Sequence, residues 1–297
     1  MINSYKVGNP KVTIFGGSGF VGRYVVYLFA QNGWQISVVV RNPNIAGFLK
    51  LYGTEGQISL VKANISDEEK ITSAIKGSHA IVNCVGILEE MGGSQKFDLL
   101  HNKYIERIAK ISKFLGVGRF THISSIGASE NSLSEYSRSK RKGEIEIINN
   151  FPEAVILRPS IIFGPEDLFF NRFAKMSLFS PIIPLVGAST NFQPIYVLDI
   201  ARSVLKSVTD HSFNGIYELG GPDILSFNDL ILKMLKTIDR KRLVINVPFG
   251  IALFLSYLSG FLKKVSFKAF PSIITKDQVI QLRSDNIVRE GIKGIKD

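Results

Sequence analysis

Residues 11–22 read KVTIFGGSGFVG, and this stretch decides the fold of the 297-residue chain. A β-branched, apolar run stops at a cluster of glycines, and an amphipathic helical pattern follows at once. Gly17, Gly19 and Gly22 match the G-x-G-x-x-G spacing, in which glycines permit a sharp turn, the approach of a pyrophosphate and close packing of helix on strand. The order strand, turn, helix predicts a dinucleotide site; the alternative is an ordinary glycine-rich turn.

The same alternation of strand and helix patterns continues through the first half of the chain. Apolar runs predict strands at about 11–16, 35–40, 58–63, 80–85, 119–124 and 154–163. Helical patterns lie between them, at about 19–32, 67–76, 97–115 and 134–150. Strands that alternate with helices of this length indicate repeated βαβ units. We therefore expect an α/β fold with a Rossmann-type, doubly wound parallel sheet.

The pattern changes in the second half of the chain. Residues 166–192 are rich in Phe, Pro and Gly and read as irregular, and the chain from Pro222 on is mostly helical in pattern. We expect a dinucleotide-binding domain of residues 1–165, to which residues 193–221 return. A smaller, mostly helical C-terminal lobe would comprise residues 166–192 and 222–297. Because ligands of such sheets lie beyond the carboxyl ends of the strands, a lobe at that end would form the substrate pocket.

Composition narrows the class of protein. Hydrophobic residues make up 45% of the chain, which is ordinary for a globular protein. Cys84 is the single cysteine, so an internal disulfide is excluded and a reducing compartment is favoured. The N-terminus has no signal-peptide pattern, and no apolar run reaches the roughly 18 residues of a membrane span. We expect a cytoplasmic protein, with attachment at the inner face of a membrane as the variant.

The net charge of +11 indicates attraction to something acidic. A phosphorylated cofactor, an anionic membrane, an acidic protein and nucleic acid all fit, and a solubilising surface is the plain alternative. Nucleic acid is disfavoured because no known nucleic-acid-binding module is present. The four histidines have no metal-ligand spacing, so no metal site is expected.

The glycine turn supplies the first set of candidate cofactor residues. Amides at the start of a helix have no partner inside the helix and can face a phosphate. The residues expected there are Gly16, Gly17, Ser18, Gly19, Phe20, Val21 and Gly22.

Arg41 occupies the place where an NAD site has an acidic residue for the ribose 2′-hydroxyl. A planar guanidinium instead suits a 2′-phosphate, which it can bind with two parallel hydrogen bonds. We therefore expect NADP(H) as the cofactor. NAD(H) remains the alternative, with Arg41 and Arg23 simply solvated.

Two further strand ends carry candidate cofactor residues. Asn64 follows the third strand, and its amide offers both a donor and an acceptor to an adenine edge. Val85 and Gly86 follow the fourth strand, where a glycine lets the chain pass a nicotinamide ribose. Ordinary turn residues are the alternative in both places.

Ser125, Tyr136 and Lys140 form the candidate catalytic group. Ser125 follows the fifth strand, and Tyr136 and Lys140 stand four apart on the next predicted helix, so they share a face. An ammonium near a phenol lowers the pKa of the phenol, which can then exchange a proton with a carbonyl or carbinol oxygen. Ser125 would hold that oxygen by a hydrogen bond.

These motifs together resemble the short-chain dehydrogenase/reductase superfamily. GGSGFVG, Ser125 and YSRSK carry the resemblance, and RPSIIFGPED at 158–167 is similar to the sixth-strand end of its extended and atypical members. NFQPIYVLDIA, YELGGPDILSF and ITKDQVIQLRSDNIV are similar to one atypical branch, usually labelled NAD-dependent epimerase/dehydratase. That branch includes the nucleotide-binding accessory subunit of respiratory complex I and its bacterial relatives.

The resemblance implies roles for individual residues and two classes of function. It assigns the phosphates to the glycines, the 2′-phosphate to Arg41, and a bond to the nicotinamide ribose to Lys140. The first function is an oxidoreductase that moves a hydride to or from a carbonyl or carbinol carbon of an unidentified small molecule. The second is a non-catalytic nucleotide-holding or assembly protein of a membrane redox complex, such as complex I or one for quinone synthesis. The stretch of sequence between Ser125 and Tyr136 is shorter here than the corresponding stretch in the family.

Residues 249–262 are strongly apolar and are flanked by lysines and arginines. The segment is too short to span a bilayer. It suits a membrane interface with anionic lipid, docking on a large partner, or a core helix with a basic edge.

Overall fold

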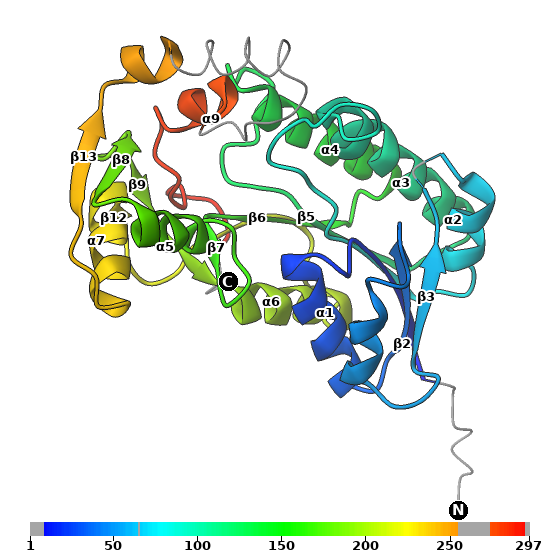
Figure 1. Cartoon of the computed structure of the whole chain (residues 1–297). Coiled ribbons are helices and arrows are strands. Elements are labelled where there is room, and N and C mark those ends of the chain that lie inside the picture. Colours follow the sequence, from blue (N-terminus) through cyan, green and yellow to red (C-terminus); the bar gives the residue numbers. More distant parts are fainter. Residues whose placement is uncertain (1–8, 65, 255–273, 295–297) are drawn as a thin grey trace, which may run out of the picture. The chain divides into compact units, whose positions relative to one another are not determined.

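The computed structural model describes residues 9–64, 66–254 and 274–294 of the chain (Figure 1). The chain divides into two compact units. The first unit comprises Met1–Ser124, Lys140–Leu157 and Val197–Tyr217. The second unit comprises Ser125–Ser139, Arg158–Tyr196 and Glu218–Asp297.

A seven-stranded sheet has the strand order β11-β6-β5-β4-β1-β2-β3. Its strands are β1 (Lys11–Phe15), β2 (Gln35–Val40), β3 (Ile58–Lys62), β4 (Ala80–Asn83), β5 (Arg119–Ile123), β6 (Val155–Pro159) and β11 (Gly215–Leu219). From β3 to β6 every neighbouring pair is parallel. The crossovers between strands place β2 and β3 on one side of β1 and β4, β5 and β6 on the other, as in a doubly wound fold. This confirms the expected Rossmann-type sheet.

Helices join these strands. They are α1 (Phe20–Gln31), α2 (Glu68–Ile75), α3 (Tyr104–Phe114), α4 (Glu135–Asn150) and α6 (Val197–Thr209). A 3₁₀ segment, η1 (Gly47–Tyr52), precedes β3, and a π-helical turn, η2 (Asp98–Lys103), leads into α3. α1 packs against α6, whereas α2 and α3 pack against each other over a second apolar cluster. Both faces of the sheet are thus covered, which explains why β2 and β5 are buried on both sides.

The second unit is built from short elements around a phenylalanine-rich core. Its helices are α5 (Phe170–Phe179), α7 (Phe227–Thr237) and α9 (Lys276–Gln281). Its strands pair as β7 (Ile162–Phe163) with β10 (Ile195–Tyr196), β8 (Ile182–Val186) with β13 (Leu243–Val247), and β9 (Asn191–Phe192) with β12 (Leu225–Ser226). Phe169, Phe173, Phe192 and Phe227 stack edge to face and tilted at its centre.

Three local expectations differ from this structure. Residues 166–192, expected to be irregular, contain α5 and β8, because phenylalanine contacts with α7 and β9 stabilise them. β13 lies in a region expected to be mostly helical, but its sequence LVINV is rich in β-branched residues that favour a strand, and it pairs in parallel with β8. The sixth strand, expected to reach residue 163, ends at Pro159, and Ile162–Phe163 pairs separately with β10.

None of the described helices is both long enough and apolar enough to cross a bilayer. Of the apolar segment expected at 249–262, residues 255–262 lie outside the described part of the chain. Within the described part, Ile251 and Phe254 are exposed.

Candidate functional site

The glycine turn of the first unit leaves no room for side chains. Gly16 has a φ of 76°, and a Cβ there would lie 3.0 Å from the backbone of Cys84 and Val85. A Cβ on Gly22 would lie 2.2 Å from the carbonyl oxygen of Gly16. Gly19 N–H donates to the same carbonyl at 3.0 Å and closes the turn. At Gly16 and Gly22, the strand, the turn and the helix therefore contact one another through backbone atoms alone.

Helix α1 begins at an N-cap residue that makes no side-chain hydrogen bond to the helix. Its N-cap, Gly19, offers no side-chain acceptor, and its first turn holds no acidic residue. The amides of Phe20, Val21 and Gly22 are the first of the helix and have no carbonyl partner within it. They leave partial positive charge at the turn, where Ser18 is half-buried. An anionic phosphate fits this cradle.

Arg41 and Asn64 lie at the same edge of the sheet as the glycine turn. Arg41 directly follows β2 and Asn64 follows β3, and both residues are exposed. β2 pairs with β1 and β3 pairs with β2, both in parallel, so the carboxyl ends of all three strands lie at the same end of the sheet. Arg23, in α1, donates to the Gly19 carbonyl at 3.4 Å and lies over the Phe48 ring.

Val85 and Gly86 follow β4 on the other side of β1. Asn83 accepts a hydrogen bond from Val85 N–H at 3.1 Å, which shapes the loop. A Cβ on Gly86 would lie 3.2 Å from Lys140 Nζ. Lys140 is 4% exposed and donates to the Ile123 carbonyl at 3.1 Å. The first unit thus brings the Lys140 ammonium directly beside the bare backbone after β4.

Lys140 lies in a buried polar cluster that the sequence did not reveal. Burial lowers the pKa of Lys140 to about 8, against the opposing effect of the Glu144 carboxylate. Burial also lowers the pKa of His101 to about 2, so this imidazole is neutral and accepts from Ile87 N–H at 3.0 Å. Glu144 is fully buried and accepts from Ser124 Oγ at 2.5 Å.

The lowered pKa of Lys140 predicts a pH dependence of stability. The unfolded chain keeps this proton up to about pH 10.5, whereas the folded chain loses it near pH 8, so the unfolded state binds more protons between these values. The free energy of unfolding should therefore rise with pH across that window, relative to Lys140→Met, by an amount on the order of 3 kcal/mol. Urea titrations at several pH values measure the difference. The Lys142→Met variant changes an exposed lysine of the same helix and keeps Lys140, so it should show the same rise as the wild type.

Ser125 and Tyr136 belong to the second unit. Burial raises the pKa of the Tyr136 phenol above its ordinary value; the Ser125 hydroxyl partly opposes this rise, and the Asp277 carboxylate adds to it. The sequence predicted a lowered pKa from a nearby ammonium, and burial outweighs any such effect here. Although Ser125 acts on the phenol, its Oγ is buried and has no hydrogen-bond partner of ordinary geometry among the described residues.

Helix α4 carries both Tyr136, in its first turn, and Lys140, one turn later. Sequence reasoning found these two residues through their spacing. It missed Asn83, His101 and Asp277, because their contacts join segments far apart in the chain. A π-helical turn at His101, pressed against Gly143, had no sequence signal.

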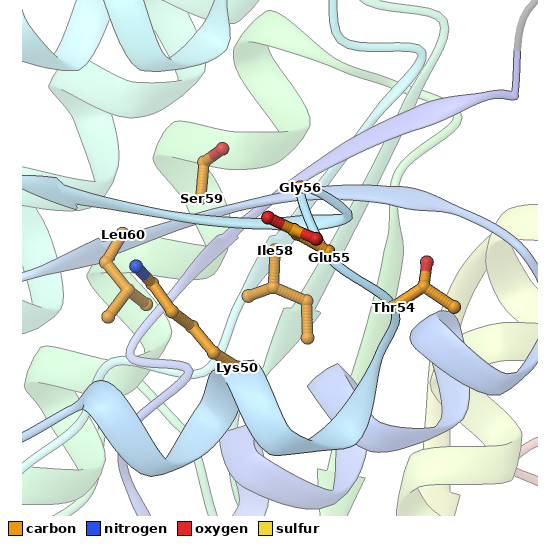
Figure 2. Close-up of a pocket in the computed structure, with 7 residues that line it drawn as sticks. All are labelled: Lys50, Thr54, Glu55, Gly56, Ile58, Ser59 and Leu60. Atoms are coloured by element: carbon orange, nitrogen blue, oxygen red, sulfur yellow. The ribbon is translucent and has the colours of Figure 1, made fainter.

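One further feature lies outside this arrangement. A hollow of about 520 Å³ is lined by Lys50 of η1 and by the turn and strand of β3, with Thr54, Glu55, Gly56, Ile58, Ser59 and Leu60 (Figure 2). Its turn precedes β3 and so lies at the amino end of that strand, away from the glycine turn.

Within residues 9–64, 66–254 and 274–294, no three His, Cys, Asp or Glu side chains gather where they could hold a metal ion.

Comparison with known proteins agrees with this geometry. A family described as NAD(P)H-binding matches residues 16–165, about half of the chain. "NADH dehydrogenase [ubiquinone] 1 alpha subcomplex subunit 9, mitochondrial" of Arabidopsis thaliana is 32% identical over 96% of this chain and 72% of its own length. A "Ceramide reductase" of Caulobacter vibrioides is 28% identical over 65% of this chain and 59% of its own.

A solved structure shares the fold. The NADPH-dependent quinone oxidoreductase QOR2 of Escherichia coli, complexed with NADPH, has a TM-score of 0.67 at 18% identity, covering 91% of this chain and 87% of that one. The family match, the Arabidopsis relative that aligns with almost the whole of this chain, and the parallel sheet agree with one another. The chain therefore belongs to the NAD(P)H-binding, short-chain dehydrogenase/reductase-type family, in the branch of the complex I alpha subcomplex subunit 9 relatives.

Proposed function

We propose that this protein is an NADP(H)-dependent oxidoreductase acting on a carbonyl or carbinol carbon. The observation that carries the proposal is the buried Ser125 hydroxyl, which acts on the buried Tyr136 phenol and makes no well-aligned hydrogen bond among the described residues. A buried hydroxyl whose hydrogen bonding is incomplete costs free energy unless a ligand completes it. A substrate oxygen bonded by both hydroxyls would do so. The ceramide reductase relative supports a reductase chemistry.

The proposed cofactor site uses residues after four neighbouring strands, β3, β2, β1 and β4, together with Lys140 of α4. The turn Gly16–Gly22 would hold the pyrophosphate, Arg41 the 2′-phosphate and Asn64 the adenine edge. Val85, Gly86 and Lys140 would meet the nicotinamide ribose. NADP(H), when bound, supplies or accepts the hydride. Residues 166–192 and 222–297 are proposed as the lobe that selects the substrate.

The proposed roles of the catalytic residues follow from their protonation. Because burial raises the pKa of Tyr136, the phenol is protonated at neutral pH and ready to donate its proton to a carbonyl oxygen. Lys140, one helical turn away along α4, keeps most of its charge below its pKa of about 8 and would stabilise the phenolate that remains. Ser125 would orient the oxygen. In the oxidation direction the same proton returns to Tyr136.

The function is tested by identifying the bound nucleotide and then seeking turnover. Mass spectrometry of the purified protein should find NADP(H). Loss of the reduced nicotinamide absorbance should then follow addition of one member of a panel of aldehydes, ketones and quinones. A protein that binds NADP(H) but oxidises it with no member of the panel contradicts the enzymatic proposal.

Arg41→Ala should weaken NADPH binding roughly 10- to 100-fold and leave NADH binding unchanged, because only NADPH carries the 2′-phosphate. Titration calorimetry with both dinucleotides measures this. Lys76→Ala serves as the control, because it removes an exposed cation at the amino ends of the strands, away from the glycine turn. Equal NADPH affinity in wild type and Arg41→Ala would refute the role given to Arg41 and favour NAD(H).

A second candidate is a nucleotide-holding accessory or assembly protein of a membrane redox complex. It is favoured by the Arabidopsis relative, which is named as a subunit of NADH dehydrogenase and covers almost the whole chain. Such a protein would sit at the membrane through its complex rather than by a span of its own. Tagged protein should then co-purify with redox-complex subunits from detergent-treated membranes, and Tyr136→Phe should fully restore a deletion strain. Failure of both results removes this candidate.

A further inference from the structure

Helix α4 is capped by a residue 142 positions away from its first residue in the sequence. One carboxylate oxygen of Asp277 accepts from Glu135 N–H at 2.6 Å. The other accepts from Ser134 Oγ at 2.8 Å and from Tyr136 N–H at 3.3 Å. All of these groups belong to the second unit.

The cap is divided between a local and a remote acceptor. Ser134 Oγ accepts from Ser137 N–H at 3.2 Å, as a serine N-cap does. This leaves the first two amides of α4, those of Glu135 and Tyr136, without a partner from the helix itself. Asp277 satisfies both and places a negative charge at the positive end of the helix. The position of the Tyr136 backbone therefore depends on the C-terminal segment.

Asp277 is itself firmly held. Thr275 and Gln278 form a capping box that starts α9, and Gln281 donates to the Asp277 carboxylate at 2.9 Å. The segment after α9 is fixed as well, because Asn286 accepts from Ser160 Oγ at 2.7 Å. We call residues 274–294 the C-terminal strap.

A second carboxylate of the strap has a different neighbour. Asp285 accepts from Asn191 N–H at 2.8 Å and from Asn191 Nδ2 at 3.1 Å. It therefore anchors the strap to β9 and forms none of the contacts with α4 described above. This gives a matched comparison with Asp277 within one segment.

We propose that Asp277 is the positioning residue of Tyr136, fixing the first turn of α4 and setting the charge around the phenol. The inference rests on the proposed function only in taking Tyr136 as the proton-transferring group. The Asp277 carboxylate contributes to the raised pKa of that phenol and so helps to keep it in its acid form. The C-terminal strap is then part of the site rather than a surface attachment.

The test uses three variants of the full chain. Asp277→Asn keeps an acceptor oxygen but removes the charge, Asp277→Ala removes both, and Asp285→Asn removes the matched carboxylate. Amide hydrogen exchange of Glu135 and Tyr136 reports the cap. The alkaline absorbance of tyrosinate reports the phenol, with Tyr136→Phe subtracted to remove the other eight of the nine tyrosines.

Asp277→Ala should speed exchange of the two amides roughly fivefold or more, and Asp277→Asn should do so less. Both should lower the pKa of Tyr136, because both remove the negative charge of Asp277. Asp285→Asn should change neither reading. Unchanged exchange and titration in Asp277→Ala, or equal effects from Asp285→Asn, would overturn the inference. Neither reading needs turnover, so a failed proposal of oxidoreductase activity leaves this result separately decidable.

Discussion

Replacing Gly22 with alanine is expected to abolish dinucleotide binding and to lower the free energy of unfolding by about 3 kcal/mol or more. The added methyl group would lie 2.2 Å from the Gly16 carbonyl oxygen and 2.7 Å from Gly17 Cα. Both contacts are with backbone, so no side chain can rotate away. Gly16 cannot retreat either, because its carbonyl carries the turn-closing bond from Gly19 and its backbone adjoins the loop after β4. The helix must separate from the strand, and the phosphate cradle opens.

Gly47→Ala is the matched control for this prediction. A Cβ on Gly47 meets no atom within 4 Å, and its φ is not positive, so it should cost little. Urea unfolding measures the first effect and calorimetry with NADPH the second. Wild-type NADPH affinity in Gly22→Ala would show that the nucleotide binds elsewhere, and the proposed cofactor site would be wrong.

Tyr136→Phe is expected to reduce turnover roughly 10²- to 10⁴-fold while leaving NADPH affinity unchanged. The substitution keeps the buried ring and removes only the hydroxyl that would give its proton to the substrate oxygen. Tyr136 is 9% exposed, so the ring still fills its place in the core. Solvent water is a poor substitute donor at a buried position. The loss should therefore fall on kcat rather than on cofactor binding.

Tyr104→Phe controls for loss of a buried phenol as such. Tyr104 is 6% exposed, packs edge to face on Phe15 and forms part of the core of the first unit. Its variant should retain turnover. If Tyr136→Phe oxidises NADPH as fast as wild type with the same carbonyl substrate, Tyr136 is not the proton donor. The accessory role then becomes the better account of the protein.

The sequence predicted the nucleotide half of the protein well because its signals are local. A strand, a glycine turn and a helix within residues 11–32 need no distant partner to be recognised, and the parallel sheet follows from the alternation that continues to residue 159. The second unit was harder. β8 and β13 come from separate parts of the chain and pair with each other, and the β-branched residues of both segments are a strand signal that the expectation of an irregular and a helical region missed.

The order of residues by itself determined the glycine turn, the parallel sheet that follows from repeated crossovers, and the spacing of Tyr136 and Lys140 on one helix. Folding decided the properties that depend on burial and on distant neighbours. Burial sets the pKa of Lys140 and raises that of Tyr136, and a carboxylate from the C-terminal strap completes the start of α4. Helix and turn signals act over a few residues, whereas desolvation and remote hydrogen bonds exist only once segments far apart in the chain have packed together.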